Sequence, residues 1–383
     1  MIFTKDKNTY FADVNKDLKI EIGDSKQETA FYPQLKILAF DNEINFSIRL
    51  KTVETGTDSK DAAEKITWSG AKTGAEFYDV AADPGHPAGA IEFNIILKEK
   101  PASRFIEFTT EKKDVELFYQ GPLTDLIGVD GIVTATETEG KDKDGNIFIR
   151  RPENVVYSYA IYHRRPPANV VGGKEYRAGK IGHIYRPLIT DSTGKKTYGI
   201  LINDDVNNML KIEIPEDFYN SAIYPVTVDP TFGYTTIGGT EVYFNAPGSL
   251  CHIGAGLIFS PTSGYNRVTK FTCYGRGDHN EFSLYSISGG LPVSRLAAGV
   301  ECDLPAANAW KDTDPINQTL TNGITYGLAE GHANAVYVFF DTGAGNQRSA
   351  CATDLPATWS STGTTAALYS WYTTYETVNE QIL

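Results

Sequence analysis

Apolar and polar residues alternate with a period of two along most of this chain. The alternation is clearest in residues 18–22, 44–50, 91–97, 155–161 and 210–214. Successive side chains of an extended strand point to opposite faces of a sheet, so this pattern predicts half-buried antiparallel strands. Short strands separated by frequent turn sequences favour sandwiches and jelly rolls. We therefore expect an all-β fold built from tandem antiparallel β-sandwich or jelly-roll domains.

Helical patterns are confined to two short segments. Residues 58–65 have the composition for two turns of helix, and residues 215–219 for one turn that starts at Pro215, a position where proline is tolerated. No window of about twelve residues has an amphipathic helical pattern. In the last third, residues 256–259, 267–274, 281–286, 325–329, 335–340 and 366–372 each predict a strand.

The composition changes near Asp229-Pro230. Lys and Arg number 29 in residues 1–230 and 6 in residues 231–383, and all four cysteines lie in the second part. A chain of 383 residues is long enough for two or three domains with separate cores. We expect an N-terminal attachment sandwich at 1–121, a second β-rich domain or a continuation of the first at 122–230, and a displayed C-terminal sandwich at 231–383.

The net charge of −13 disfavours two classes of partner. Nucleic acid needs stripes of Lys and Arg against its phosphates, and an anionic membrane surface repels an acidic chain. The first residues are polar and lack the apolar core of a secretory signal, and the longest apolar runs have strand length. We expect synthesis in the cytoplasm without a signal peptide and without membrane insertion, with export only by lysis or a signal-independent route.

The cysteines and acidic residues show no metal-binding spacing. Cys251, Cys273, Cys302 and Cys351 include no C-x-x-C pair and have no His at ligand spacing, which predicts buried, reduced thiols. Two disulfides formed after release are the alternative. Residues 142–153 superficially resemble a calcium loop, but Ile147 occupies the position that needs Gly, so a β-turn is predicted there. We expect no cofactor and no metal.

Catalytic signatures are also missing from the sequence. No G-x-S-x-G nucleophile elbow is present, and the Gly-rich stretches 238–239 and 343–345 lack the following Lys and helix of a phosphate loop. Paired carboxylates for glycoside hydrolysis meet only in the fold, so their spacing in sequence cannot locate them. We expect a protein that is not an enzyme.

Aromatic residues are the main candidates for ligand contact. Exposed aromatic rings can stack on the apolar faces of sugar rings, whereas residues 369–371 would normally share a buried face of a sandwich. Trp310, on an expected loop, is the best exposed candidate. Arg276, Asp278 and His279 form the densest polar cluster of the second half, read either as a charged turn between strands or as a sugar-binding group. Our candidate glycan contacts are Trp310, Arg276, Asp278 and His279.

Three stretches together resemble a known group of proteins. They are residues 118–123, residues 151–163 with 178–187, and residues 214–234, which end in Tyr-Pro-Val-Thr-Val-Asp-Pro-Thr-Phe-Gly-Tyr. This pattern is similar to virion-associated structural proteins of tailed bacteriophages and prophages, over roughly residues 1–240. The resemblance implies a place in the virion, with an exchangeable C-terminal module. It transfers no catalytic motif.

These observations lead us to expect a non-enzymatic virion structural protein, of capsid-decoration or head-fibre type. It would attach to other virion proteins through its N-terminal part, form a homo-oligomer, and display a C-terminal sandwich that contacts host-surface glycan. One alternative is a tail or receptor-binding component or a glycan-binding adhesin, which aromatics exposed in a row on one sandwich face would indicate. Another is a polysaccharide-degrading enzyme, which two acids about 5 or 6.5–9.5 Å apart would indicate.

Overall fold

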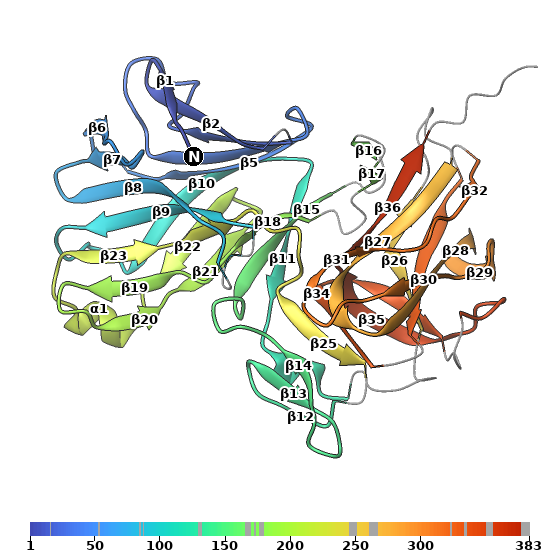
Figure 1. Ribbon diagram of the computed structural model, residues 1–383. Coiled ribbons are helices and arrows are strands. Elements are labelled where there is room, and N and C mark those ends of the chain that lie inside the picture. The colour runs from blue at the N-terminus through green and yellow to red at the C-terminus, as the bar shows by residue number, and fades with distance from the viewer. Residues whose placement is uncertain are drawn as a thin grey trace, which may run out of the picture. The chain divides into compact units, whose positions relative to one another are not determined.

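The computed structural model divides the chain into two compact units. Unit 1 comprises residues 1–117, 157–164 and 181–235, and unit 2 comprises residues 118–156, 165–180 and 236–383. The structure describes residues 1–383 except 16, 53, 84–85, 87, 129–131, 165–169, 172–173, 176–179, 245–250, 260–266, 322–323, 333–334, 350–354 and 377–383. Figure 1 shows the strands of both units, and the predicted all-β fold of tandem antiparallel β-sandwich domains is confirmed.

Unit 1 contains two sheets. The first has the order β1 (Thr4–Asp6), β2 (Thr9–Asn15), β3 (Leu18–Ile22), β4 (Gln34–Ala39), β5 (Ile44–Leu50), β10 (Phe105–Lys113), β22 (Met209–Glu213) and β21 (Ile200–Asp204). The alternation at residues 44–50 explains its packing, because Ile44, Phe46 and Ile48 are buried while Asn45 and Arg49 reach the surface side.

The second sheet packs against the same hydrophobic core. Its order is β11 (Val115–Gln120), β15 (Ser158–His163), β18 (Lys180–Ile184), β24 (Thr231–Gly233), β9 (Ala90–Leu97), β23 (Val226–Asp229), β19 (Leu188–Asp191) and β20 (Lys196–Tyr198), and β8 (Thr73–Val80), β7 (Ile66–Ser69) and β6 (Thr57–Lys60) pair onward from β9. The core joins Phe46 and Phe108 of the first sheet to Phe77 and Phe93 of the second. These aromatic rings fill the space between the layers.

The two expected helices have different outcomes. The single turn at residues 215–219 is confirmed as α1 (Glu216–Ser221). The helix expected at residues 58–65 is wrong, because residues 57–60 form β6 in register with β7. The Asp61 side chain then accepts the amide protons of Ala63 and Lys65, which closes a turn instead of a helix. In the described residues no helix has the length and hydrophobicity of a membrane span.

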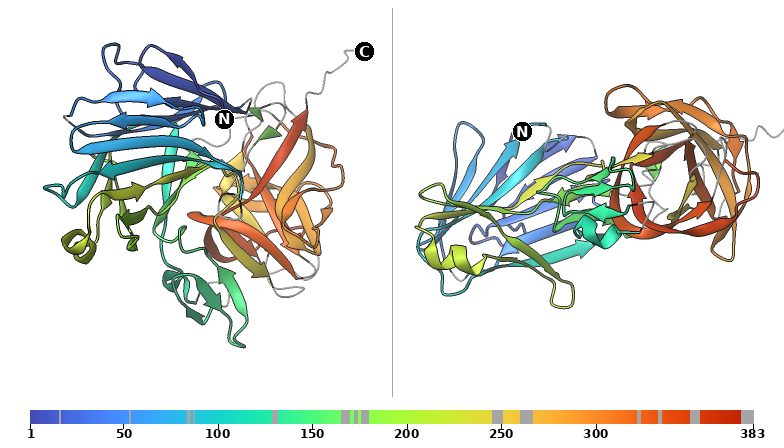
Figure 2. Two further views of the ribbon diagram at one scale, coloured as in Figure 1. Left: turned by 60° about the vertical axis from the view of Figure 1, so that its left-hand side comes forward. Right: turned by 90° about the horizontal axis from the view of Figure 1, so that it is seen from below.

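Unit 2 is built from one connected set of strands that curls round on itself (Figure 2). The strands are β12 (Thr134–Ala135), β13 (Glu139–Lys141), β14 (Ile147–Arg150), β16 (Val170–Val171), β17 (Lys174–Glu175), β25 (Thr240–Phe244), β26 (Cys251–Phe259), β27 (Arg267–Gly277), β28 (His279–Ser288), β29 (Leu291–Arg295), β30 (Val300–Asp303), β31 (Ala309–Asp312), β32 (Gln318–Thr319), β33 (Tyr326–His332), β34 (Val336–Ser349), β35 (Ser361–Tyr369) and β36 (Trp371–Glu376). The short helix η1 (Leu123–Leu126) packs beside β12 and β13.

The strands of unit 2 enclose their own core. Val338, Phe282, Phe271 and Trp371 are among its buried members. The strand expected over residues 366–372 is interrupted at Ser370, which separates β35 from β36. The Ser370 hydroxyl accepts the amide proton of Gly238 at 2.7 Å, so this interruption satisfies a buried donor of another segment.

The unit boundaries differ from the expected division at 121 and 230. The chain leaves unit 1 at Leu117 and again at Thr235, close to those points, but residues 118–156 belong with the C-terminal half. The reason is strand pairing: Ile149 and Arg150 of β14 pair with Val242 and Glu241 of β25. Unit 2 is therefore assembled from segments on both sides of the change in composition.

Candidate functional site

Five neighbouring strands of unit 2 form one continuous antiparallel surface. Their order is β31, β27, β34, β25 and β14. Directly paired residues of neighbouring strands point to the same side of a sheet, so the register identifies which side chains share a face. The pairs are Trp310 with Tyr274, Arg276 with Tyr337, Tyr337 with Tyr243, Phe339 with Glu241, and Glu241 with Arg150.

The outward side of these strands is rich in aromatic residues. We call it the aromatic face and define it by Phe148, Tyr243, Tyr274, Trp310, Tyr337 and Phe339. All six side chains are partly or largely exposed, and Trp310 is 37% exposed. The residues between them, such as Val242 and Val338, are buried in the core of unit 2. Period-two alternation thus places valines inside and aromatic rings outside on the same strands.

The rings of the aromatic face contact one another in two groups. Tyr243 and Tyr337 are stacked with centroids 4.5 Å apart. Tyr274 meets Trp310 at 5.3 Å and Phe339 at 5.2 Å, both edge to face. Such packing holds each ring in place at little further cost in side-chain entropy, so the face is preorganised for contact with a flat ligand.

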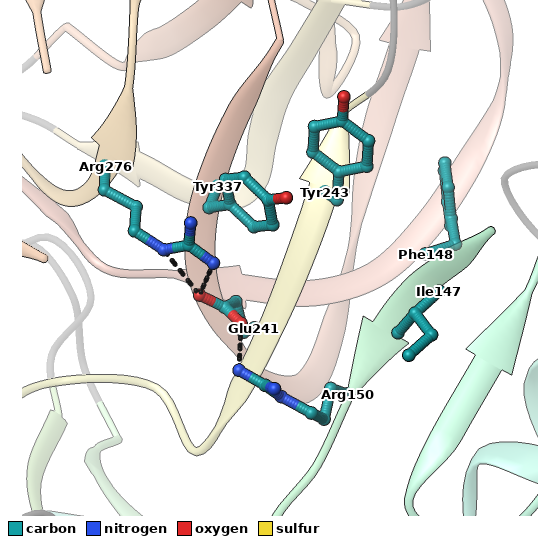
Figure 3. Close-up of a pocket in the computed structure, with 7 residues that line it drawn as sticks. All are labelled: Ile147, Phe148, Arg150, Glu241, Tyr243, Arg276 and Tyr337. Carbon is teal, nitrogen blue, oxygen red and sulfur yellow. Dashed lines mark hydrogen bonds and ion pairs between the residues drawn. The ribbon is translucent and has the colours of Figure 1, made fainter. Parts of the chain in front are cut away.

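Charged groups lie directly beside these rings. The Arg276 guanidinium lies over the Tyr337 ring at 3.5 Å from its centroid and donates to Glu241 Oε1 at 3.1 and 3.3 Å. Arg150 donates to Glu241 Oε2 at 2.8 Å. Figure 3 shows this arrangement, with Tyr243 between Tyr337 and Phe148. Burial, with the negative charge of Glu241 as a smaller cause, raises the pKa of Tyr274.

A hollow of about 180 Å³ opens among these groups. It is lined by Ile147, Phe148, Arg150, Glu241, Tyr243, Arg276 and Tyr337. Aromatic walls with a few charged groups are typical of small-molecule sites. Among these lining residues two arginines face a single carboxylate.

The local backbone explains how Arg276 reaches Tyr337. Gly275 precedes Arg276 on β27, and a Cβ at that position would lie 2.2 Å from the carbonyl oxygen of Tyr337. Only glycine lets the two strands approach this closely. The glycine therefore positions the guanidinium over the ring.

The structure separates the four predicted contacts into two places. Trp310 and Arg276 lie together on the aromatic face, joined through β27. Trp310 lies in β31, where its backbone pairs with Tyr274, and the expectation of a loop there is wrong. Asp278 occupies the bend between β27 and β28, and His279 is the first residue of β28.

His279 makes a separate polar cluster with two acids of β30. Its Nδ1 is 3.1 Å from Asp303 and its Nε2 is 3.5 Å from Glu301. The three side chains could offer ligand atoms within 4.8 Å of one another. However, each ring nitrogen faces a different carboxylate, which is the geometry of an imidazole bridging two acids and not of three ligands that converge on one point.

Sequence reasoning missed most of the aromatic face. Tyr243, Tyr274, Tyr337 and Phe339 each alternate with buried residues, and this period-two signal was available. The sequence did not indicate that the three strands that carry them, β25, β27 and β34, are neighbours. Arg150 was equally hidden, because its strand lies 91 residues before Glu241.

Other predicted residues lie in the core or in a turn. Tyr369 and Trp371 are buried, as expected, and Trp359 is buried as well. The side chains of two further aromatic residues near the C-terminus, Tyr372 and Tyr375, lie outside the described residues. The turn predicted at residues 142–146 is present between β13 and β14. There the Asp142 side chain accepts from Asn146, both from its side chain and from its backbone, which lowers the pKa of Asp142.

The cysteines that can be described are free thiols. Cys273 and Cys302 are buried and are not joined in disulfides, as predicted. Burial raises the pKa of both thiols, that of Cys302 to about 12. Cys351 and the side chain of Cys251 lie outside the described residues.

Comparison with known proteins gives little. No family model matches this chain, and no curated protein matches it. Among solved structures, a crystal structure of a GH31 alpha-xylosidase from Xanthomonas citri is similar at 9% identity and a TM-score of 0.11. It covers 96% of this chain and 36% of the xylosidase, so the chain spans about a third of that protein. A TM-score this low carries no argument about fold or activity.

Proposed function

We propose that this protein is a non-enzymatic virion structural protein whose unit 2 binds glycan through the aromatic face. The observation that carries the glycan part is the row of partly exposed rings on one side of five paired strands. The virion part rests on the resemblance of residues 1–240 to virion-associated phage proteins. Within the virion it would decorate the capsid or form a head fibre.

The face has the chemistry that sugars require. Pyranose rings present apolar C–H faces that pack on aromatic rings, while their hydroxyls need donors and acceptors nearby. Trp310 supplies the most exposed ring. In the hollow, the hydroxyl of Tyr337 points toward Tyr243, and the charged groups of Arg276, Glu241 and Arg150 line its other side (Figure 3). A sugar could therefore gain apolar contact and hydrogen bonds at the same place.

The carboxylates of the site support binding over hydrolysis. Glycoside hydrolysis needs two acids on opposite sides of the bond that is cut. Glu241 is the sole carboxylate among the described residues that line the hollow, and both of its oxygens accept from arginines. A carboxylate held in this way is poorly suited to donate a proton to a leaving group.

The first experiment measures glycan binding by the full-length protein. The protein would be run through gels containing neutral or acidic polysaccharides, together with the variants Trp310→Ala and Tyr243→Ala. Phe105→Ala is the matched control, because Phe105 is also 37% exposed but lies in unit 1. We expect the two variants to lose at least about tenfold in affinity and the control to lose none.

Two results would overturn the glycan proposal. One is that no polysaccharide of either class retards the protein. The other is that Trp310→Ala changes the oligomeric state in solution while leaving glycan binding intact, because Trp, Tyr and Arg are also enriched in protein interfaces.

A second experiment tests the virion part. Particles purified from the source culture would be analysed by peptide mass spectrometry for this chain at a fixed ratio to the major capsid protein. Many copies per particle support decoration, and a few copies support a tail or vertex position instead. Absence from the particles overturns the virion proposal and leaves a glycan-binding adhesin.

A further inference from the structure

We infer that the glycan bound by the aromatic face is acidic, carrying carboxylate groups. This inference rests on the proposed glycan-binding function and adds the class of sugar. It starts from the charges at the hollow, where Arg150 and Arg276 face one carboxylate, that of Glu241.

Positive charge is scarce in this part of the chain. Residues 231–383 contain 6 Lys and Arg against 12 Asp and Glu, and the whole chain carries a net charge of −13. One of those six cations is Arg276, and Arg150 reaches the same hollow from β14. Two arginines beside one carboxylate leave an excess of one positive charge among the residues that line the hollow, whereas the chain as a whole is acidic. Glu139, the neighbour of Arg150 across β13 and β14, is not part of this lining.

Neither arginine is fully used by Glu241. Arg150 gives Glu241 one nitrogen, Nη2, and its side chain is 59% exposed. Arg276 gives Nε and Nη2, which leaves Nη1 for another acceptor. Guanidinium groups bind carboxylate and sulfate through paired N–H donors, and such charge-assisted hydrogen bonds are stronger than neutral ones.

Glu241 also fixes where these donors lie. It is 8% exposed and holds one arginine on each of its oxygens, so both guanidiniums stay at the edge of the hollow. Tyr337 supports Arg276 from below through the cation–π contact. The ion pair between Lys270 of β27 and Asp312 of β31 is balanced in charge and adds no excess.

The test compares each acidic polysaccharide with its own uncharged form. Polygalacturonate, alginate, hyaluronan and polysialic acid would each be used before and after reduction of their carboxylates to alcohols. The full-length protein should bind at least one acidic polymer about tenfold more tightly than its reduced form, and this preference should shrink as salt is raised.

Two substitutions move the charge in opposite directions. Arg150→Gln should lower affinity for the acidic polymer about tenfold and leave any binding of the reduced polymer unchanged. Glu241→Gln raises the excess charge but also removes the carboxylate that holds both guanidiniums, so its readout is the ratio of the affinities for the acidic and the reduced polymer, which should rise. Arg104→Gln, at a partly exposed arginine of unit 1, is the control for loss of one positive charge.

The outcomes separate this inference from the function on which it rests. Equal affinity for acidic and reduced polymers, sensitive to Trp310→Ala, overturns the acidic preference and leaves glycan binding standing. If Arg150→Gln does not weaken binding of the acidic polymer, the inference is also overturned, because residues outside the hollow would then recognise the carboxylates. Absence of binding to every polymer, charged or reduced, overturns both.

Discussion

Asp341 illustrates how one buried charge holds several segments of unit 2 together. Its Oδ2 is 2.7 Å from Lys180 Nζ, and its Oδ1 accepts the amide proton of Gly239 at 2.8 Å. The side chains of Lys180 and Asp341 are fully buried, and the charge of Asp341 also acts on the buried Arg151. Burial lowers the pKa of Arg151 to about 10 and lowers that of Lys180 as well.

Replacing Asp341 should therefore be costly. Asp341→Asn leaves Lys180 buried without its counter-charge, and we expect unit 2 to lose about 3–5 kcal/mol of unfolding free energy. Urea unfolding followed by tryptophan fluorescence measures this, because three of the four tryptophans, Trp310, Trp359 and Trp371, lie in unit 2. Asp144→Asn, in an exposed turn, is the control. An unchanged midpoint for Asp341→Asn would contradict the assigned role.

Unit 1 also contains a buried acid, Glu92. Burial, with a hydrogen bond to Asp229 as the second cause, raises the pKa of Glu92 from 4.5 to about 9. The Thr231 hydroxyl lies 2.9 and 3.0 Å from its two oxygens. The native state thus binds a proton here that the unfolded chain releases above pH 4.5.

This proton makes the stability of unit 1 depend on pH. The contribution of the protonated Glu92 to the free energy of unfolding is fully present below about pH 4.5 and is lost as pH rises toward 9. We expect Glu92→Gln to flatten this slope and to be more stable than the natural protein at pH 8 by about 1–3 kcal/mol. Thermal unfolding at pH 5, 7 and 9 checks it. A natural protein equally stable at pH 5 and pH 9 would refute the assignment.

At the scale of elements, the aromatic face depends on the close pairing of β27 with β34. These strands meet at Gly275, where a Cβ would collide with the Tyr337 carbonyl at 2.2 Å. The obstacle is backbone, so it cannot turn aside as a flexible side chain could. Tyr274 and Arg276, the residues on either side of Gly275 in β27, both point to the aromatic side of the sheet.

Gly275→Ala should therefore damage both stability and binding. We expect a loss of about 1–3 kcal/mol from unit 2 and, at temperatures where it stays folded, weaker glycan binding because Arg276 is displaced from Tyr337. Gly140→Ala in β13 is a suitable control, because its nearest contact would be an ordinary 3.4 Å. Calorimetry and the polysaccharide gels measure the two effects. If Gly275→Ala has the same stability and glycan affinity as the unmodified protein, the paired strands β27 and β34 can accommodate a side chain at this position.

At the scale of the whole molecule, the C-terminal half of the chain is not a complete unit. Residues 236–383 contain most strands of unit 2, but β14, Arg151 and Lys180 come from earlier segments. β14 pairs with β25, and Arg151 donates to Thr240 at 2.7 Å and to Thr342 at 2.9 Å. A division at the change in composition would cut through this unit.

A fragment of residues 236–383 should consequently fold poorly by itself. It would expose the edge of β25 and leave Asp341 buried without Lys180. We expect it to unfold at a clearly lower temperature than unit 2 of the full chain, and addition of a peptide of residues 118–156 to raise that temperature. Circular dichroism during heating measures both. A fragment as stable as the intact unit would contradict the assembly described here.

The sequence by itself determined the all-β class of this protein and many of its strands, but not β6 or β31. Alternation as regular as that of residues 44–50 fits only a sheet with one buried face, because a one-residue shift would expose every apolar side chain. The sequence also distinguished the buried Tyr369 and Trp371 from the exposed Trp310. Tyr369 and Trp371 belong to an apolar run of strand length, whereas Trp310 has polar neighbours.

Only the tertiary structure decided which strands are neighbours, and with that the candidate site. Arg150, Glu241, Arg276 and Tyr337 come from four strands and meet through pairings between residues far apart in the chain. Period-two alternation states which face a side chain occupies, but it contains no information about the partner of that strand. Pairing depends on close approaches such as that at Gly275, which arise only when the whole unit is packed.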